Sequence, residues 1–145
     1  MKKFFLAMLS IITLTGCSIK SDTQLPDPQT VIIHWNLTKI TGGVAGVNEE
    51  FTLNTIVWTF GVSDLKLTVE NNNTDDTKQD GLDSGTYDYS ITETSGKSFL
   101  NIGSNEFGRF TVTNNTLVID QNELSQGSGT DGFVYTFQKT IEVID

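Results

Sequence analysis

Apolar and polar residues alternate along most of the chain from residue 31 onward. The first alternating run, VIIHWNL, places Val31, Ile33, Trp35 and Leu37 on one side of an extended strand. Alternation with a period of two, rich in β-branched and aromatic residues, is typical of strands, and no later stretch keeps the 3.6-residue period of a helix. The pattern predicts an all-β domain of eight strands, near residues 31–41, 53–60, 64–70, 85–93, 98–102, 106–113, 116–121 and 132–140.

Three short turns predict how neighbouring strands pair, because a hairpin turn determines the register of its strands. The pairs Asn114-Asn115 and Ser95-Gly96 suit two-residue turns, since Asn and Gly tolerate positive φ, and residues 61–64 suit a third turn. Each turn sets apolar residues opposite apolar residues, which supports the all-β interpretation. The predicted partners are Val112 and Leu117, Phe110 and Ile119, the oppositely charged Arg109 and Asp120, Ile91 and Leu100, Tyr89 and Ile102, Phe60 and Leu65, Trp58 and Leu67, and Ile56 and Val69.

Eight consecutive antiparallel strands, each with one apolar face, form an up-and-down β-barrel, a β-sandwich or a half-open barrel. A small eight-stranded barrel is either filled by its own side chains or holds one small ligand. Many of the residues expected to face inward are aromatic, which leaves room for a small cavity at most. These residues are Trp35, Trp58, Phe60, Tyr87, Tyr89, Phe110, Phe133, Tyr135 and Phe137.

The first twenty residues, MKKFFLAMLSIITLTGCSIK, have a different pattern. Two lysines precede an apolar run over residues 4–14 that is shorter than the roughly 20 residues needed to span a bilayer, which is the layout of a secretory signal. The segment LTGC, ending at Cys17, resembles the lipobox of bacterial lipoproteins. In that family the chain is cut before the cysteine, which carries diacylglycerol and an amide-linked fatty acid such as palmitate. The resemblance implies a signal peptide over residues 1–16, a lipidated Cys17 and flexible tether over 17–30, and a domain over 31–145.

Charge and composition narrow the partners of this domain. After removal of the signal peptide, seven basic residues stand against 18 acidic ones, a net charge of −11. A domain this acidic is repelled by nucleic acid, which we exclude as a partner. Residue 18 is Ser rather than Asp, and by resemblance to the sorting rule of enteric bacteria this favours the outer membrane. We therefore expect a lipid-anchored protein of the bacterial cell envelope whose protein partners the sequence does not name.

Several strand motifs resemble those of lipocalin-like proteins, in particular small bacterial lipocalin-like lipoproteins. The motifs are W-x-L at 35–37 followed by Gly42-Gly43, W-x-F at 58–60, and Y-x-F at 135–137 followed by Lys139. The chain departs from secreted animal lipocalins at Ile33, where they place a glycine, and it lacks their cysteines. The resemblance implies a barrel closed at one end by Trp35. Lys139 then either lies over the indole in a cation–π contact or is a solvated surface residue.

Two loops invite ligand hypotheses. The segment GGVAG, 42–46, is not a phosphate-binding loop, because its glycine spacing differs and Glu49 and Glu50 follow where a helix would be needed. We expect a mobile loop over 42–52, at the mouth of the barrel. The segment 70–85 carries four aspartates but fails as an EF-hand, since Lys78 and Tyr87 fall at ligand positions. A different calcium site or a solvated acidic surface both remain open, and we predict no metal site and no cofactor.

The candidate chemistry for an enzyme is sparse. The single histidine, His34, has the opposite parity to Trp35 and is expected to point away from the barrel interior. No G-x-S-x-G motif is present, and a lipidated Cys17 leaves no free thiol. We therefore predict no catalytic residue and no enzymatic activity.

Two functions of different kinds fit these observations. One is a membrane-anchored binding module that holds a small apolar or amphipathic ligand in a shallow barrel, which we favour. The other is a non-enzymatic structural or interaction lipoprotein whose barrel is filled by its own side chains. In the first case the candidate ligand-lining residues are Trp58, Phe60, Tyr87, Tyr89, Tyr135 and Phe137, with the phenols as polar contacts.

Overall fold

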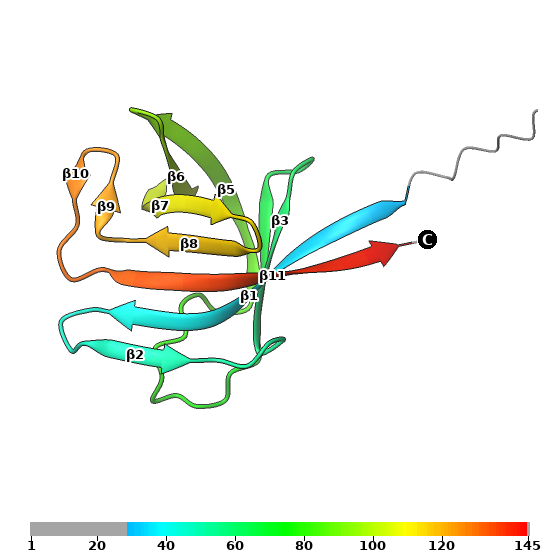
Figure 1. The fold of residues 1–145 in the computed structure, drawn as a ribbon, viewed down its shortest axis with the longest axis horizontal. Coiled ribbons are helices and arrows are strands. Elements are labelled where there is room, and N and C mark those ends of the chain that lie inside the picture. Colours follow the sequence, from blue (N-terminus) through cyan, green and yellow to red (C-terminus); the bar gives the residue numbers. More distant parts are fainter. Residues whose placement is uncertain (1–28, 145) are drawn as a thin grey trace, which may run out of the picture.

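The alternating runs form one closed sheet in the computed structural model, which describes residues 29–144 (Figure 1). The expected signal peptide, Cys17 and most of the tether lie outside the described residues. Residues 29–144 contain eleven strands: β1 Thr30–Gly42, β2 Val47–Glu50, β3 Ile56–Gly61, β4 Lys66–Asn71, β5 Gly85–Thr94, β6 Lys97–Ile102, β7 Asn105–Thr113, β8 Thr116–Asp120, β9 Glu123–Leu124, β10 Gly127–Ser128 and β11 Phe133–Ile144.

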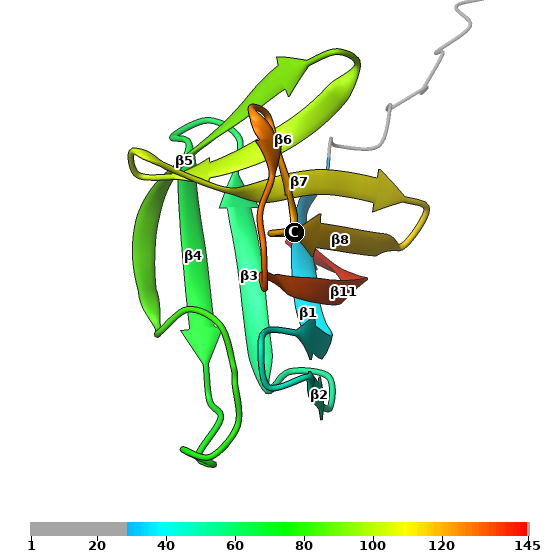
Figure 2. The ribbon, with the colours of Figure 1, turned by 90° about the vertical axis from the view of Figure 1, so that its left-hand side faces the viewer.

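Eight of these strands form an antiparallel barrel with sequential up-and-down order. The order runs β1, β3, β4, β5, β6, β7, β8, β11, and pairing of β11 with β1 closes the sheet. Figure 2 shows β3 and β4 side by side, with β7, β8 and β11 running across them on the other side of the barrel. The predicted all-β up-and-down barrel is confirmed, and the sandwich and half-open alternatives are wrong because the sheet is closed.

Two of the three predicted hairpins have the predicted register. Phe110 pairs with Ile119 across the β7–β8 hairpin, and Tyr89 pairs with Ile102 across the β5–β6 hairpin. The backbone of Arg109 lies opposite that of Asp120, as predicted, but its guanidinium binds Glu123 instead, with 2.8 Å between Nη1 and Oε1. This contact joins the small β9–β10 hairpin to the barrel.

The predicted register of the β3–β4 hairpin is wrong by two residues. Phe60 pairs with Leu67 rather than Leu65, and the loop comprises residues 62–65. Leu65 adopts a left-handed conformation, with φ of 53°, which lets the turn close one residue later than predicted. The aspartate Asp64 supports this turn by accepting a hydrogen bond from the backbone N–H of Lys66 at 3.2 Å. Because a shift of two residues keeps each side chain on its face, Leu67 and Val69 still point inward, whereas Leu65 lies in the turn and is 54 % exposed.

A β-bulge in β7 changes which residues fill the interior. Leu100 pairs with Gly108 and Asn101 with Glu106, so Phe107 is an extra residue on its strand. Phe107 and Phe110 are three residues apart and would face opposite sides of a regular strand, yet both pack against the core. The sequence analysis therefore missed Phe107 as an inward aromatic residue.

The predicted loop over residues 42–52 is in part a strand. Residues 47–50 form β2 and pair with residues 39–42 of β1, with a turn at 43–46. Gly42 has φ of 106°, and a Cβ there would lie 2.5 Å from the carbonyl oxygen of Gly132. The absence of a side chain at Gly42 therefore lets the segment before β11 approach the end of β1 closely. β2 forms because β3 pairs with β1 at Trp35 and Asn36 and leaves this edge of β1 open.

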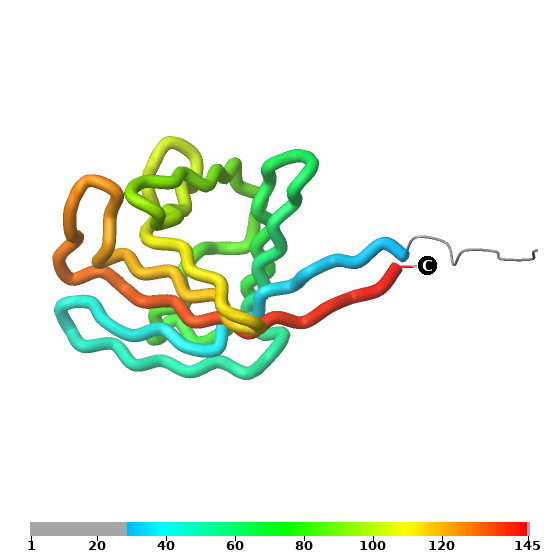
Figure 3. Tube along the Cα trace, turned by 45° about the horizontal axis from the view of Figure 1, so that its top comes forward, coloured from blue at the N-terminus to red at the C-terminus, as the bar shows by residue number. Residues whose placement is uncertain are grey.

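The two ends of the domain form a terminal ribbon, which we define as residues 30–34 of β1 and 140–144 of β11. These residues pair with one another from Thr30 and Ile144 to His34 and Thr140. Pairing of β11 with β8 ends at Gln138. The terminal ribbon therefore extends beyond the barrel, and Figure 3 shows it projecting away from the other strands.

Candidate functional site

The interior of the barrel is packed with side chains around Trp58. This indole is fully buried, and its ring centroid lies 5.0 Å from that of Phe137, 5.9 Å from Phe107 and 6.4 Å from both Phe60 and Tyr135. Its Nε1–H is the only buried side-chain nitrogen or oxygen of the described chain without a hydrogen-bond partner. These aromatic rings occupy the middle of the barrel, where a ligand would otherwise lie.

The candidate ligand-lining residues are brought together, but mainly as packing partners. Trp58 and Phe137 are fully buried, and Tyr135 is nearly so. The ring of Phe60 packs edge to face on Tyr89, with 5.0 Å between centroids. The hydroxyl of Tyr89 donates to the carbonyl of Gly61 at 3.3 Å.

The two other tyrosines lie near the segment between β4 and β5. The hydroxyl of Tyr87 donates to the carbonyl of Asp83 at 2.9 Å. Burial raises the pKa of the Tyr135 phenol to about 12, and the negative charge of Asp80 adds to the shift. Gly81 lies against the same ring, because a Cβ at this glycine would come within 3.2 Å of Tyr135 Cε1. This segment therefore covers Tyr135 at the far end of the barrel from the terminal ribbon.

Trp35 and Lys139 are direct partners on β1 and β11. Trp35 is buried in the core cluster, and Lys139 lies at the base of the terminal ribbon. The cation–π contact of the described chain is formed instead by Lys78, whose Nζ lies 5.3 Å from the ring centroid of Phe51. Lys139 therefore forms no cation–π contact with Trp35, which leaves the other alternative, a solvated surface residue.

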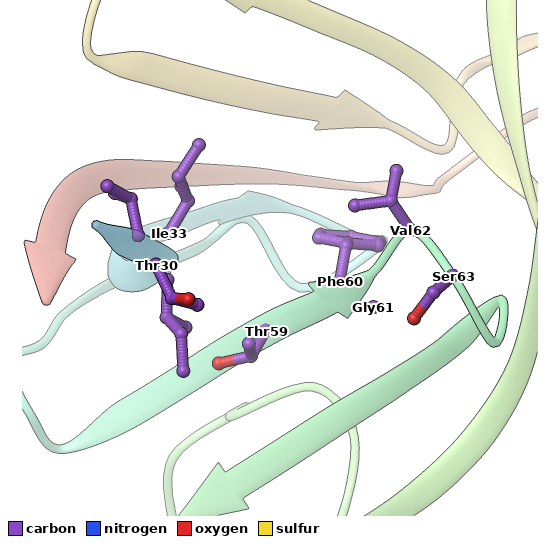
Figure 4. Close-up of a pocket in the computed structure, with 9 residues that line it drawn as sticks. Thr30, Ile33, Thr59, Phe60, Gly61, Val62 and Ser63 are labelled. Carbon is purple, nitrogen blue, oxygen red and sulfur yellow. The ribbon is translucent and has the colours of Figure 1, made fainter. Parts of the chain in front are cut away.

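A groove of about 390 Å³ opens where β1 separates from β3 (Figure 4). One wall consists of residues 30–33 and the other of residues 59–63. The apolar side chains of Ile33, Phe60 and Val62 line it, and Val62 is 88 % exposed. Phe60 is the one candidate ligand-lining residue that borders this groove. The signal that could have predicted the groove is the apolar alternation at Val31 and Ile33, which continues before Trp35.

His34 lies on the outer face of the barrel beside this groove. Its Nδ1 lies 2.8 Å from Thr59 Oγ1 and its Nε2 lies 3.0 Å from Glu142 Oε2. Hydroxyl, imidazole and carboxylate in this order can activate a nucleophile when the carboxylate is buried and orients the ring. The side chain of Glu142 is 60 % exposed, however. We interpret the three groups as a link that joins β3, β1 and β11 at the base of the terminal ribbon.

Asn36 is a buried polar residue that the sequence analysis missed. Its side chain is fully buried, and its Nδ2 donates to Thr140 Oγ1 at 2.9 Å. Its Oδ1 accepts a hydrogen bond from the backbone N–H of Asn54 at 2.8 Å. Asn36 thus joins β1 to β11 and to the segment before β3. Its position between two apolar residues, Trp35 and Leu37, is a weak signal because outward-facing polar residues follow the same pattern.

The acidic segment 72–84 is held by its own hydrogen bonds. Asp75 accepts hydrogen bonds from the hydroxyl of Thr77 at 2.6 Å and from its backbone N–H at 3.1 Å, which lower the pKa of the Asp75 carboxyl. Asp80 accepts from the side-chain amide of Asn73 at 3.0 Å. Among residues 29–144, no three His, Cys, Asp or Glu side chains are grouped so that they could hold a metal ion.

Comparison with known proteins assigns the start of the chain. Residues 1–18, which include Cys17, match the prokaryotic membrane lipoprotein lipid attachment site. Together with the closed sheet, this match defines the class: a lipid-anchored membrane lipoprotein of a prokaryote with a β-barrel domain. Neither the curated proteins nor the solved structures contain a match to the chain. In the described part of the chain, no helix is long and apolar enough to span a membrane.

Proposed function

We propose that this lipoprotein is a non-enzymatic interaction protein of the cell envelope whose barrel is filled by its own side chains. The packing around Trp58 carries the proposal, because four aromatic rings surround a fully buried indole in the middle of the barrel. A filled interior makes the barrel a rigid support, so that recognition falls to its surface. Of the two functions that fit the sequence, the packing therefore favours this second one over a ligand inside the barrel.

The proposal includes no catalytic group. The imidazole of His34 is engaged on both ring nitrogens, by Thr59 and Glu142, on the outer face. The exposed Glu142 carboxylate does not provide the buried charge that orients an imidazole in hydrolases. The packing also favours this class over a lipocalin-like carrier, although the up-and-down strand order is the one that the resemblance implies.

Native mass spectrometry of the lipidated chain, released from detergent micelles, tests the proposal. We expect a single mass equal to the mature chain with its acyl groups, and no stable uptake of added palmitate. An additional mass that persists in the folded protein, disappears on unfolding and is unaffected by Val62→Glu in the surface groove would contradict a filled barrel and support a ligand inside it.

The groove between β1 and β3 supports a second candidate function, the binding of a small apolar ligand on the surface of the barrel. Its walls are mostly apolar, and its volume of about 390 Å³ lies within the range of small-ligand sites. If palmitate binds there, Val62→Glu should abolish its uptake, whereas Val44→Glu should leave the uptake unchanged. The two valines are a matched pair, being 88 % and 87 % exposed, and Val44 lies in the turn between β1 and β2.

We further propose that the anchor lies in the outer membrane. The support is Ser18, which occupies the position after the lipidated cysteine where Asp would favour the inner membrane of enteric bacteria. The acidic surface of the barrel would then lie in the envelope, where a cationic partner is a better match than an anionic one.

A further inference from the structure

One face of the terminal ribbon consists entirely of exposed apolar side chains. Val31 pairs directly with Val143, and Ile33 pairs directly with Ile141. The four side chains are between 44 % and 57 % exposed. They continue the face that holds Trp35 and Leu37 inside the barrel, since residues two apart share one face of a strand. The terminal ribbon therefore extends the interior face of the barrel into solvent.

The opposite face of the terminal ribbon is mostly polar. It carries His34 beside Thr140 and Ile32 beside Glu142, with Thr30 and Ile144 at the tip. The carboxylate of Glu142 lies 3.0 Å from His34 Nε2, so the one acidic side chain of the terminal ribbon has a partner on this polar face. The terminal ribbon is thus an amphipathic two-stranded element. Its apolar face is two strands wide and two residue pairs long.

The lipid anchor lies close to this element along the chain. Twelve residues separate Cys17 from Thr30. Even a fully extended chain of this length spans at most about 45 Å. The terminal ribbon is therefore the part of the barrel to which the membrane-bound cysteine is joined, and this length is the greatest distance that Thr30 can move from the anchor.

Charge is distributed unequally between the two ends of the barrel. The terminal ribbon and the turns 62–65, 95–96 and 114–115 contain two acidic residues, Asp64 and Glu142, and a third, Asp145, follows the terminal ribbon in the sequence. The segments 43–55, 72–84 and 121–132 at the other end contain eight acidic residues and one lysine. The eight are Glu49, Glu50, Asp75, Asp76, Asp80, Asp83, Glu123 and Asp131.

The difference in charge favours contact between lipid and the end that carries the terminal ribbon. Anionic head groups repel acidic side chains within about one Debye length, roughly 8–10 Å at physiological salt. The end with eight carboxylates is therefore driven away from the bilayer. The end with the terminal ribbon has fewer carboxylates to oppose contact with lipid, and it has exposed apolar surface that gains from this contact.

We infer that the apolar face of the terminal ribbon, with Val62 beside it in the groove wall, rests in the head-group region of the bilayer that holds the lipid anchor. Amphipathic elements bind this region by burying apolar side chains while their polar face stays in water. The anchor supplies the high local concentration that a small apolar surface needs for stable contact. The barrel is then oriented, with its acidic segments directed away from the membrane.

Site-specific labelling of the lipidated full-length chain tests this orientation. Since Cys17 is the only cysteine and its thiol is lipidated, an introduced cysteine is the only free thiol. Ile141→Cys probes the apolar face of the terminal ribbon, and Val44→Cys is the matched control at the opposite end. Both are labelled with an environment-sensitive fluorophore and placed in vesicles of phosphatidylcholine and anionic phosphatidylglycerol that contain head-group nitroxide lipids. We expect at least threefold stronger quenching at position 141 than at position 44.

A second pair of variants separates membrane contact from mere proximity to the anchor. Val143→Glu places a charge on the apolar face and should reduce quenching of the 141 label to the level of the 44 label. Glu142→Gln, on the polar face of the same strand, should leave the quenching at 141 unchanged. Thermal unfolding of each variant shows whether the barrel itself is intact, and position 143 lies at the solvent-exposed tip.

Three outcomes would overturn the inference. Equal quenching at both positions would mean that the barrel has no preferred orientation. A blue-shifted 141 label that is not quenched, and whose emission depends on the protein-to-lipid ratio, would mean that a second copy covers the apolar face. Loss of the quenching on addition of palmitate would mean that the face binds a free ligand rather than the bilayer.

Discussion

Two neighbouring residues, Phe107 and Gly108, decide how the middle of the barrel is filled. The bulge in β7 turns Phe107 toward Trp58, with 5.9 Å between their ring centroids. It is possible because residue 108 is glycine: its φ is 148°, and a Cβ would lie 2.5 Å from the carbonyl oxygen of Asp120. A residue with a side chain would push β8 away from β7. The glycine is thus required by the approach of two backbones.

The raised pKa of Tyr135 predicts how the free energy of unfolding changes with pH in alkaline solution. Because its pKa is about 12 in the folded protein and about 10 in the unfolded chain, the unfolded state loses the phenolic proton first as the pH rises. The free energy of unfolding should therefore fall between pH 10 and 12, by about 2–3 kcal/mol for a shift of this size. Below pH 10 both states keep the proton, and this contribution does not change.

Urea unfolding of Tyr135→Phe between pH 8 and pH 12 tests this prediction. We expect the variant to lose most of the alkaline decrease, while a smaller part remains because burial and Asp64 also raise the pKa of Tyr89. Asp80→Asn should reduce the decrease less than Tyr135→Phe does, since burial is the larger cause of the Tyr135 shift. An unchanged slope in Tyr135→Phe would show that this phenol does not titrate late.

Among the strands, β1 organises the rest of the sheet. It pairs along its length with β11 on one edge, and on the other edge with β3 at residues 35–36 and with β2 at residues 39–42. A bulge between Leu37 and Lys39 allows Leu37 and Ile40 both to be buried. Residues 30–34 have no strand on the edge toward β3 within the described chain, and the groove forms there.

The side chain of Asn36 provides a test of this arrangement. Asn36→Ala should lower the free energy of unfolding by about 1–3 kcal/mol, because the backbone N–H of Asn54 and the hydroxyl of Thr140 lose their fully buried partner. Asn48→Ala, at an exposed position of β2, is the matched control and should change the value by less than about 0.5 kcal/mol. Equal effects in urea unfolding would mean that Asn36 does not join these elements.

At the scale of the full protein, the two ends of the barrel differ in two properties, exposed apolar surface and charge. Apolar side chains are exposed on the terminal ribbon, and acidic side chains gather on the segments at the other end. The lipid anchor joins the chain next to the terminal ribbon, so the apolar end is the end attached to the membrane. The filled barrel, the proposed membrane contact and the acidic far end together describe a rigid unit that displays a negatively charged surface at a set height above a bilayer.

The membrane that holds the anchor is open to a direct test. Ser18→Asp should move the protein from outer-membrane to inner-membrane fractions in an enteric host, since Asp at this position directs retention in the inner membrane. Density-gradient fractionation with an immunoblot measures the distribution, and Ser21→Asp, which adds the same charge three residues later, is the control. A distribution that is the same for the native protein and for Ser18→Asp would contradict sorting by residue 18.

Much of the fold could be predicted from local features. Strand positions follow from the alternation, and two-residue turns determined the registers of Phe110 with Ile119 and Tyr89 with Ile102 correctly. The longer β3–β4 turn has more than one acceptable closure, so its register was wrong. The candidate site was predicted less well: most of the residues proposed to line a ligand pack in the core, and Phe60 alone borders the groove.

The signal peptide, the lipid attachment site and the class of fold were determined by the sequence, because each depends on residue types at short, covalently set spacings. The filling of the barrel, the two bulges, the pairing of β2 and the groove depend on how distant strands meet when the sheet closes. A bulge such as that at Phe107 forms where the closed sheet needs an extra residue, and the alternation of its own strand carries no sign of it. The exposed face of the terminal ribbon also depends on how the sheet closes. Its apolar residues alternate as in a buried strand, but the terminal ribbon extends past the end of the barrel and they stay exposed.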